Sequence, residues 1–463
     1  MNFDRVLAGG KVVLEDCVEH LDIGIRSGRI AGLLTPGTAT GDGDLIDVTG
    51  HYVLPGAIDP HTHVEWPIGE DNSQDDFLMA TMAAAIHGTT TIIDFVPIAR
   101  GIAPLDAIEA RVSLAEGSSV IDYGFHPILT SGTRQVVSQI GEMIKGGFAS
   151  FKIYTTYDDL RLDGGEIWTV MQEIAHHGGI AGFHAECHDL IGTLTRACMD
   201  EGRVGIEAFP ASRPGLAESQ AIGMVARYAR ELDAPIYIFH ASGEQAVTAI
   251  REQQRLGTRV QAETCTHYLA LNDEVFSGPD AWRYVITPPI RDEGSREALW
   301  SAVKDRTVCA VASDHCAYGR RHKRPGFDDF TRMPPGAPGI AARVPVTWDE
   351  GINRGRLTPV DFSHAISTGA ARALGLYPRK GVLRVGSDAD IMVVDPAASW
   401  TWDHREDSGS DYSLYEQRPG RGAVRMTLAA GKVIARDGRF VGGSRTGAFL
   451  ARRATDDHRA SGV

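Results

Sequence analysis

Short apolar runs alternate with longer amphipathic stretches through the middle of this chain. The runs that predict strands are 54–64, 89–95, 120–129, 149–154, 180–184, 236–240, 260–264 and 308–313. Strand and helix patterns that alternate in this way predict a parallel sheet, because parallel strands need a crossover between them. Eight such strands favour a (β/α)8 barrel of the TIM type over an open sheet.

The helix boundaries in this region carry recognisable capping signals. The stretch 75–87 begins with two aspartates and is followed by Gly88, so it predicts a helix with acidic residues at its start and a terminating glycine. Thr358 and Pro359 predict the start of a last helix, with proline at its first position, which ends at Gly375.

The two ends of the chain resemble each other. Residues 8–16 and 429–437 both contain an Ala-Gly-Lys-Val or Gly-Gly-Lys-Val stretch broken by glycine, which is typical of antiparallel strands with tight turns. We therefore expect a β-sandwich domain made of 1–54 and 378–440, around a barrel domain of 55–377. The C-terminal tail, 441–463, is polar and is expected to be poorly ordered unless a partner subunit holds it.

Composition limits the classes of function. The chain has 463 residues, 43% of them hydrophobic, and a formal charge of -14, so general binding to nucleic acid or to an anionic membrane is not expected. Six cysteines without C-x-x-C spacing indicate reduced, intracellular thiols rather than a disulfide framework. No signal peptide and no long apolar run is apparent, so we expect a soluble, cytoplasmic protein.

Polar residues of one kind gather at the ends of the predicted strands. His61 and His63 are two apart on a strand and face the same way, while His184, His240 and Asp314 each end an apolar run. The carboxyl ends of barrel strands meet at one face, where active sites lie. Imidazole and carboxylate ligands suit divalent ions, zinc most commonly. A lone histidine of this kind is more often a core residue, but five such positions predict a metal site.

Lys152 lies inside the apolar run Phe151-Lys152-Ile153-Tyr154. Burying an ammonium group on a barrel strand is costly, so the lysine must be paired, lowered in pKa or chemically changed. One interpretation is an ion pair with a neighbouring carboxylate. The other is carbamylation by CO2, which turns the cation into a carboxylate that can bridge two metal ions.

Residues 5 to 440 resemble the dihydropyrimidinase/hydantoinase branch of the amidohydrolase superfamily. The matching motifs occur in the family's order and are Leu54-Pro-Gly-Ala-Ile-Asp-Pro-His-Thr-His63, Asp75-Asp-Phe77, Gly88-Thr-Thr-Thr-Ile-Ile-Asp-Phe95, Ser150-Phe-Lys-Ile-Tyr154, Phe183-His-Ala-Glu186, Glu263-Thr-Cys-Thr-His-Tyr-Leu269, Thr287-Pro-Pro-Ile-Arg291 and Ser313-Asp-His-Cys316. The resemblance implies two divalent metal ions per chain, with zinc the first choice and Mn, Fe, Co or Ni as alternatives. It also suggests a homo-oligomer, a tetramer.

The same resemblance assigns roles to the candidate residues. His61 and His63 hold one metal with Asp314, His184 and His240 hold the second, and carboxylated Lys152 bridges the two. A hydroxide between the metals attacks a ring amide carbonyl, and Asp314 carries the proton to the departing nitrogen. The family's oxyanion-binding tyrosine corresponds to Tyr157. Glu186 and His315 are candidates to orient ligands, with simple solvation as the alternative.

The predicted substrate pocket departs from the family pattern. Thr287 replaces a serine before the Pro-Pro motif, and Met333-Pro-Pro-Gly336 places Pro335 where an asparagine is usual. Pro335 has no N–H to donate to the ureide, although its carbonyl and Gly336 remain. Ala341 stands where the family usually has a glutamate. In the loop after His63, Trp66 and Ile68 are expected to face an exocyclic substituent of the substrate.

The reaction expected from these features is the opening of a ring amide in a cyclic ureide, either a dihydropyrimidine or a 5-substituted hydantoin. An allantoinase or a cyclic imide hydrolase is the main alternative. Glu65 disfavours a dihydroorotase, which carries an arginine at this place to pair the substrate carboxylate. A non-enzymatic scaffold would lack the metal ligands, and a mononuclear deaminase would lack the bridging lysine, so both are less favoured.

Overall fold

The computed structural model describes residues 2–39, 43–443 and 447–453. Its central part is a closed barrel of parallel strands. Eight barrel strands occur among these residues: β6 (Ala57–Thr62), β9 (Thr89–Val96), β10 (Asp122–Pro127), β11 (Ser150–Tyr154), β12 (Ile180–His184), β13 (Ile236–Ile238), β14 (Val260–Cys265) and β15 (Ala310–Ala312). They form two ladders, and the bridges Ile128–Lys152 and Thr62–His315 close the ring between them. The predicted barrel is confirmed.

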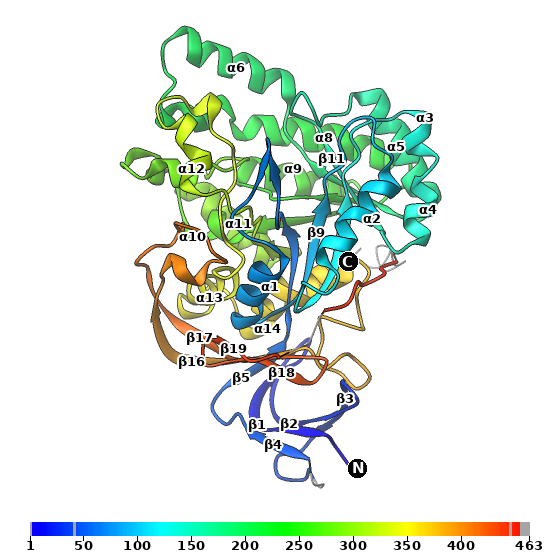
Figure 1. The fold of residues 1–463 in the computed structure, drawn as a ribbon, viewed down its shortest axis with the longest axis vertical. Helices are drawn as coiled ribbons and strands as arrows, with labels where there is room; N and C mark the ends of the chain where they lie inside the picture. The colour runs from blue at the N-terminus through cyan, green and yellow to red at the C-terminus, as the bar shows by residue number, and fades with distance from the viewer. Residues whose placement is uncertain (1, 40–42, 444–446, 454–463) are drawn as a thin grey trace.

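Helices surround these strands (Figure 1). They are α1 (Phe77–Ile86), α2 (Pro104–Ala115), α3 (Arg134–Val137), α4 (Ile140–Lys145), α5 (Gly164–His176), α6 (His188–Asp200), α7 (Phe209–Ser212), α8 (Gly215–Glu231), α9 (Glu244–Arg255), α10 (Thr266–Ala270), α11 (Glu293–Lys304), α12 (Arg320–Lys323), α13 (Arg343–Trp348), α14 (Pro359–Ser363) and α15 (Gly369–Ala373). Within the described ranges, no helix has the length and apolar character needed to cross a membrane.

The helix ends follow the capping signals of the sequence. Helix α1 starts after Asp76, whose carboxylate accepts a hydrogen bond from the backbone N–H of Met79, and Gly88 follows it with a φ of 94°. Thr358 caps α14 in the same way. The predicted last helix is interrupted by a π turn at His364–Thr368 before α15.

The predicted strand 54–64 is in fact two strands. β5 (Tyr52–Pro55) pairs with the terminal sheet, and the chain then turns at Gly56 into β6 of the barrel. The turn needs glycine, since a Cβ on residue 56 would lie 2.3 Å from Oγ1 of Thr90. A continuous apolar pattern cannot reveal this change of sheet, because both strands are buried.

Both ends of the chain contribute to a single sheet, which has nine strands in the described part of the protein. Besides β5, these are β1 (Arg5–Val13), β2 (Val18–Arg26), β3 (Arg29–Leu34), β4 (Asp44–Asp47), β16 (Ile391–Thr401), β17 (Pro419–Ala429), β18 (Lys432–Arg436) and β19 (Arg439–Phe440). β5 pairs with β1 on one side and β16 on the other. Leu7, Ile23 and Leu428 share one apolar core, which couples the N- and C-terminal strands.

The expectation of a poorly ordered tail is wrong for residues 447–453, which pack against the barrel. The backbone N–H of Leu450 donates to the carbonyl of Tyr123, and its side chain is 1% exposed. Arg452 is buried and donates to the Ser150 hydroxyl at 2.7 Å. Residues 444–446 and 454–463 of the predicted tail lie outside the described residues. The prediction failed because the tail is polar overall, and a few side chains that anchor it, such as Leu450, do not stand out in such a composition.

This packing predicts a stability effect for Leu450→Ala. Truncation of a fully buried leucine should lower the free energy of unfolding by about 2–4 kcal/mol. Leu45→Ala is the matched control, because Leu45 is 65% exposed, and should change stability by less than about 0.5 kcal/mol. Urea unfolding at one protein concentration measures both. Equal, small effects would show that the segment does not pack in solution.

Candidate metal centre and active site

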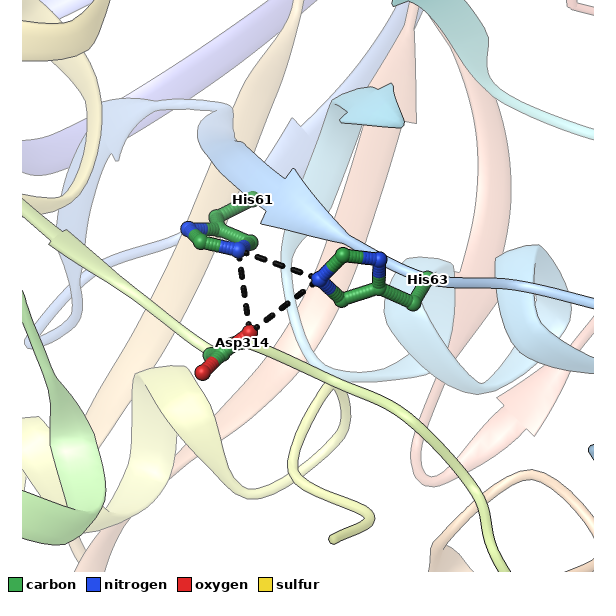
Figure 2. Close-up of side chains that lie close together, drawn as sticks. All are labelled: His61, His63 and Asp314. Atoms are coloured by element: carbon green, nitrogen blue, oxygen red, sulfur yellow. Dashed lines mark hydrogen bonds and ion pairs between the residues drawn. The ribbon is translucent and has the colours of Figure 1, made fainter. Parts of the chain in front are cut away.

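The first group of candidate ligands converges at the carboxyl end of β6 (Figure 2). Nε2 of His61 lies 2.9 Å from Oδ1 of Asp314, and Nε2 of His63 lies 3.4 Å from the same oxygen. The two imidazole nitrogens are 3.2 Å apart. These donors come from two strand ends that are far apart in the sequence and adjacent in the barrel. Three donor atoms around one small space are the arrangement that a divalent cation needs.

The second group lies beside the first. The rings of His184 and His240 are 4.5 Å apart, and the His240 ring is 5.3 Å from that of His61. His240 and Asp314 each lie two residues after the end of their strand and have positive φ values of 41° and 50°. Non-glycine residues adopt this conformation rarely, and it collects at functional sites.

Lys152 is buried among aromatic rings at the centre of the barrel mouth. Its Nζ lies 4.0 Å from the ring centroid of Phe239 and 4.8 Å from that of Phe95. Within the described ranges, no carboxylate lies within 4.0 Å of this nitrogen, so the ion pair considered from the sequence does not form. Burial lowers the pKa of Lys152 to about 8. At pH 7 about a tenth of the side chain is therefore the neutral, nucleophilic amine.

The protonation states of the other candidates suit metal binding. Burial lowers the pKa of His63 to about 3, and burial followed by the charge of Lys152 holds the pKa of His240 well below its usual range. Both rings therefore keep a lone pair at neutral pH. Burial alone would raise the pKa of Asp314, but His61 and His63 outweigh it and hold the pKa well below the usual value.

Some buried nitrogen atoms at this site have no protein partner. Nδ1 of His63 and Nδ1 of His240 form no hydrogen bond among the described residues. Unpaired polar atoms in a protein interior are costly and call for an explanation. A donor set of imidazoles and a carboxylate around a buried amine fits two divalent cations better than it fits a sealed core.

Two carboxylates orient the histidines from behind. Glu263 on β14 bonds Nδ1 of His61 and accepts a 2.9 Å hydrogen bond from the Tyr237 hydroxyl. Glu186 lies 2.6 Å from Nε2 of His184, which leaves Nδ1 of that ring for a metal. Glu186 thus contacts a candidate metal ligand, one of the two roles considered for it from the sequence. No role was assigned to Glu263 from the sequence. The signal that could have identified Glu263 is an acidic residue inside an otherwise apolar, buried strand.

His315 makes a different contact. Its Nε2 lies 2.6 Å from Oδ2 of Asp75, and its Nδ1 accepts a hydrogen bond from the backbone N–H of Gly339. His315 is therefore fixed to the start of the segment before α1 and to the loop after β15. Its side chain is buried, so it fixes the backbone beside Asp314 and does not simply face solvent.

Tyr157 stands beside the second group of ligands. Its ring is 5.2 Å from that of His184, and its hydroxyl lies 2.5 Å from Oγ1 of Thr287. The residue has a φ of 72°, which turns the chain after β11. Burial raises the pKa of Tyr157 to about 12, so the hydroxyl stays protonated and can donate a hydrogen bond. The structure therefore brings two predicted substrate-binding residues into contact.

The other predicted pocket residues differ in how firmly they are tied to the ligands. The Trp66 ring lies 4.5 Å from the ring of His63. Ile68 is half-buried in the short hairpin of β7 (Pro67–Ile68) and β8 (Asp71–Asn72). Gly336 is buried and donates its backbone N–H to Val285, two residues before Thr287, and Pro335 precedes it. Contact of Ile68, Pro335 and Gly336 with a substrate stays a prediction.

Comparison with known proteins finds the chain similar to hydrolases of one family. Residues 52–434 match the model of the amidohydrolase family. The chain is 35% identical to a D-hydantoinase of Ralstonia pickettii, with 97% of this chain and 99% of that protein covered. It is 33% identical to a D-hydantoinase of Geobacillus stearothermophilus, with 97% and 96% covered. The crystal structure of a dihydropyrimidinase from Brevibacillus agri superposes with a TM-score of 0.94, at 32% identity, over 97% of this chain and 99% of that one.

Proposed function

Because the chain belongs to the amidohydrolase family, in its hydantoinase and dihydropyrimidinase branch, we propose that it hydrolyses the ring amide of a cyclic ureide. A 5-substituted hydantoin or a dihydropyrimidine is the substrate class. The observation that carries this proposal is the gathering of His61, His63 and Asp314 beside His184, His240 and a buried, unpaired Lys152. Enzymes of this branch are metal-dependent.

Two divalent cations, zinc first among them, would be held by these residues. In the proposal the neutral amine of Lys152 attacks CO2, forms an N–C bond and releases one proton, which yields N6-carboxylysine. The product is an anionic carbamate, which would help His61, His63, His184, His240 and Asp314 to hold the two cations. A carbamate on Lys152 also removes the cost of burying an unpaired ammonium, because the metals compensate its charge.

When bound, the cations would supply an ionised water at neutral pH and polarise the carbonyl to be attacked. The side chains then divide the remaining work. Asp314 accepts the proton of the attacking water and returns it to the departing ring nitrogen. The Tyr157 hydroxyl donates to the carbonyl oxygen as negative charge develops there, and Thr287 holds that hydroxyl in place.

The same site leaves room for the alternatives within cyclic amide hydrolysis. Pro335 cannot donate an N–H to a ureide, so the substrate has lost one possible anchor relative to the family pattern. An allantoinase or cyclic imide hydrolase remains the second candidate for this reason. Glu65 disfavours a substrate carboxylate next to His63, and the complete ligand set disfavours a scaffold without activity.

We also propose that the protein works as a homo-oligomer, a tetramer, in the cytoplasm. The support for a reducing compartment is that all six cysteines, each within the described residues, are free thiols. The partner in the reaction is a small molecule.

A turnover panel tests the substrate class. The purified, metal-loaded protein is incubated with dihydrouracil, 5-substituted hydantoins, allantoin, dihydroorotate and succinimide, and ring opening is followed in the ultraviolet or by chromatography. We expect the highest kcat/KM on a hydantoin or dihydrouracil and no turnover of dihydroorotate. A preference for allantoin or succinimide would instead identify the protein as an allantoinase or a cyclic imide hydrolase. Inactivity on every compound would refute the proposed substrate class.

A further inference from the structure

A second set of metal-type donors lies on the other side of Asp314. Cys265 ends β14, His267 lies in the first turn of α10, and Asp314 follows β15. The Cys265 thiol, one ring nitrogen of His267 and one carboxylate oxygen of Asp314 all lie within 4.8 Å of one another. All three residues are buried. Cys265 and His267 have no part in the proposed reaction.

Two observations support free coordinating capacity in this set. Nε2 of His267 is buried and has no hydrogen-bond partner among the described residues. The ion pairs of Asp314 with His61 and His63 both use Oδ1. A carboxylate can bind one cation through each oxygen, so Asp314 can serve the proposed catalytic metals and a further ion together.

We propose that Cys265, His267 and Asp314 form a third metal site, which takes a thiophilic divalent cation such as Cd2+ or excess Zn2+. A thiolate, an imidazole and a carboxylate together are the ligand set that such borderline and soft ions prefer. Binding exchanges the thiol proton for the metal and releases that proton to solvent.

Occupancy of this site inhibits the reaction under the function proposed above. The cation would share Asp314, and a carboxylate that is bound on both oxygens has no basic oxygen left to accept the proton of the attacking water. The site would therefore make the enzyme sensitive to excess soft metal without loss of the catalytic metals.

Metal binding tests the site without reference to any substrate. Cd2+ is titrated into the protein after its catalytic metals have been loaded, and bound metal is counted after equilibrium dialysis. We expect one additional equivalent per chain and an ultraviolet thiolate-to-cadmium absorption band. Cys265→Ser should lose the band, and His267→Gln should weaken Cd2+ binding by at least about tenfold. Cys309→Ala is the matched control, since that buried thiol donates to the carbonyl of Ala262 outside the cluster.

Inhibition is measured on the same samples. The parent and Cys309→Ala should be inhibited as the extra equivalent binds, while Cys265→Ser keeps its activity in Cd2+. No additional equivalent in the parent, or an unchanged band in Cys265→Ser, would overturn the site. If Cys265→Ser does not fold, His267→Gln and the count on the parent still decide. Failure of the proposed function would leave these binding results unaffected, so the two outcomes can be told apart.

Discussion

Lys152→Ala is expected to lose both catalytic metals and to lower kcat/KM by about 10³-fold or more. The substitution removes the buried lysine whose charge acts on the histidines of both sets and which, once carboxylated, is proposed to bridge two metal ions. His61 and His63 would keep the carboxylate of Asp314 beside them, whereas His184 would keep Glu186, which bonds its Nε2 rather than the nitrogen left for a metal. Metal content by emission spectroscopy and turnover of the best substrate from the panel measure the two losses together.

Carbon dioxide provides the control for this variant. Metal-free parent protein that is reloaded in CO2-free buffer should recover little activity, and added bicarbonate should restore it, because the carbamate forms from dissolved CO2. The pKa of about 8 for Lys152 predicts faster recovery as pH rises through that value, since the neutral amine is the reactive form. Bicarbonate should have no effect on Lys152→Ala. Two bound metals and full activity in Lys152→Ala would refute the proposed carbamate bridge.

The sequence predicts the central barrel well because its strands carry a strong, repeated pattern. Ligands at strand ends could be assigned together since parallel strands place their carboxyl ends at one face. The β5–β6 break could not be predicted, because both strands read as one apolar run and only Gly56 marks the turn. The same holds for Leu450, whose burial depends on a docking surface that is distant in the sequence.

The side chains that contact the candidate ligands show a second limit of prediction from sequence. Glu263 contacts His61 across 202 residues of sequence, and no local pattern connects the two. Tyr157 was placed in the site through family resemblance alone, and its contact with Thr287 needs the loops after β11 and before the cis Thr287–Pro288 bond to meet in space. Strand alternation therefore fixes which face carries the chemistry, while the contacts that orient each group come from tertiary packing.

Asp314→Asn is expected to lower kcat by about 10³- to 10⁴-fold, because it removes the group that we propose moves the proton from water to the leaving nitrogen. Asparagine suits the test, since it tolerates the left-handed φ of 50° at this position and keeps the shape of the side chain. The His61, His63 and Lys152 positions are untouched, so the variant should retain more metal than Lys152→Ala. Kinetics and metal content on one preparation separate these effects.

The pH profile sharpens the assignment of Asp314, with Tyr157→Phe as the matched control. The pKa of Asp314 is held well below its usual value by His61 and His63, so the ionised carboxylate persists on acidification and its own protonation should not limit the rate until the pH falls below the usual titration range of an aspartate. Tyr157→Phe should lower kcat by about 10²-fold through loss of one hydrogen bond to the developing oxyanion, with metal content and the acid side of the profile unchanged. Asp314→Asn that retained two metals and more than a tenth of the parent kcat would show that another group carries the proton.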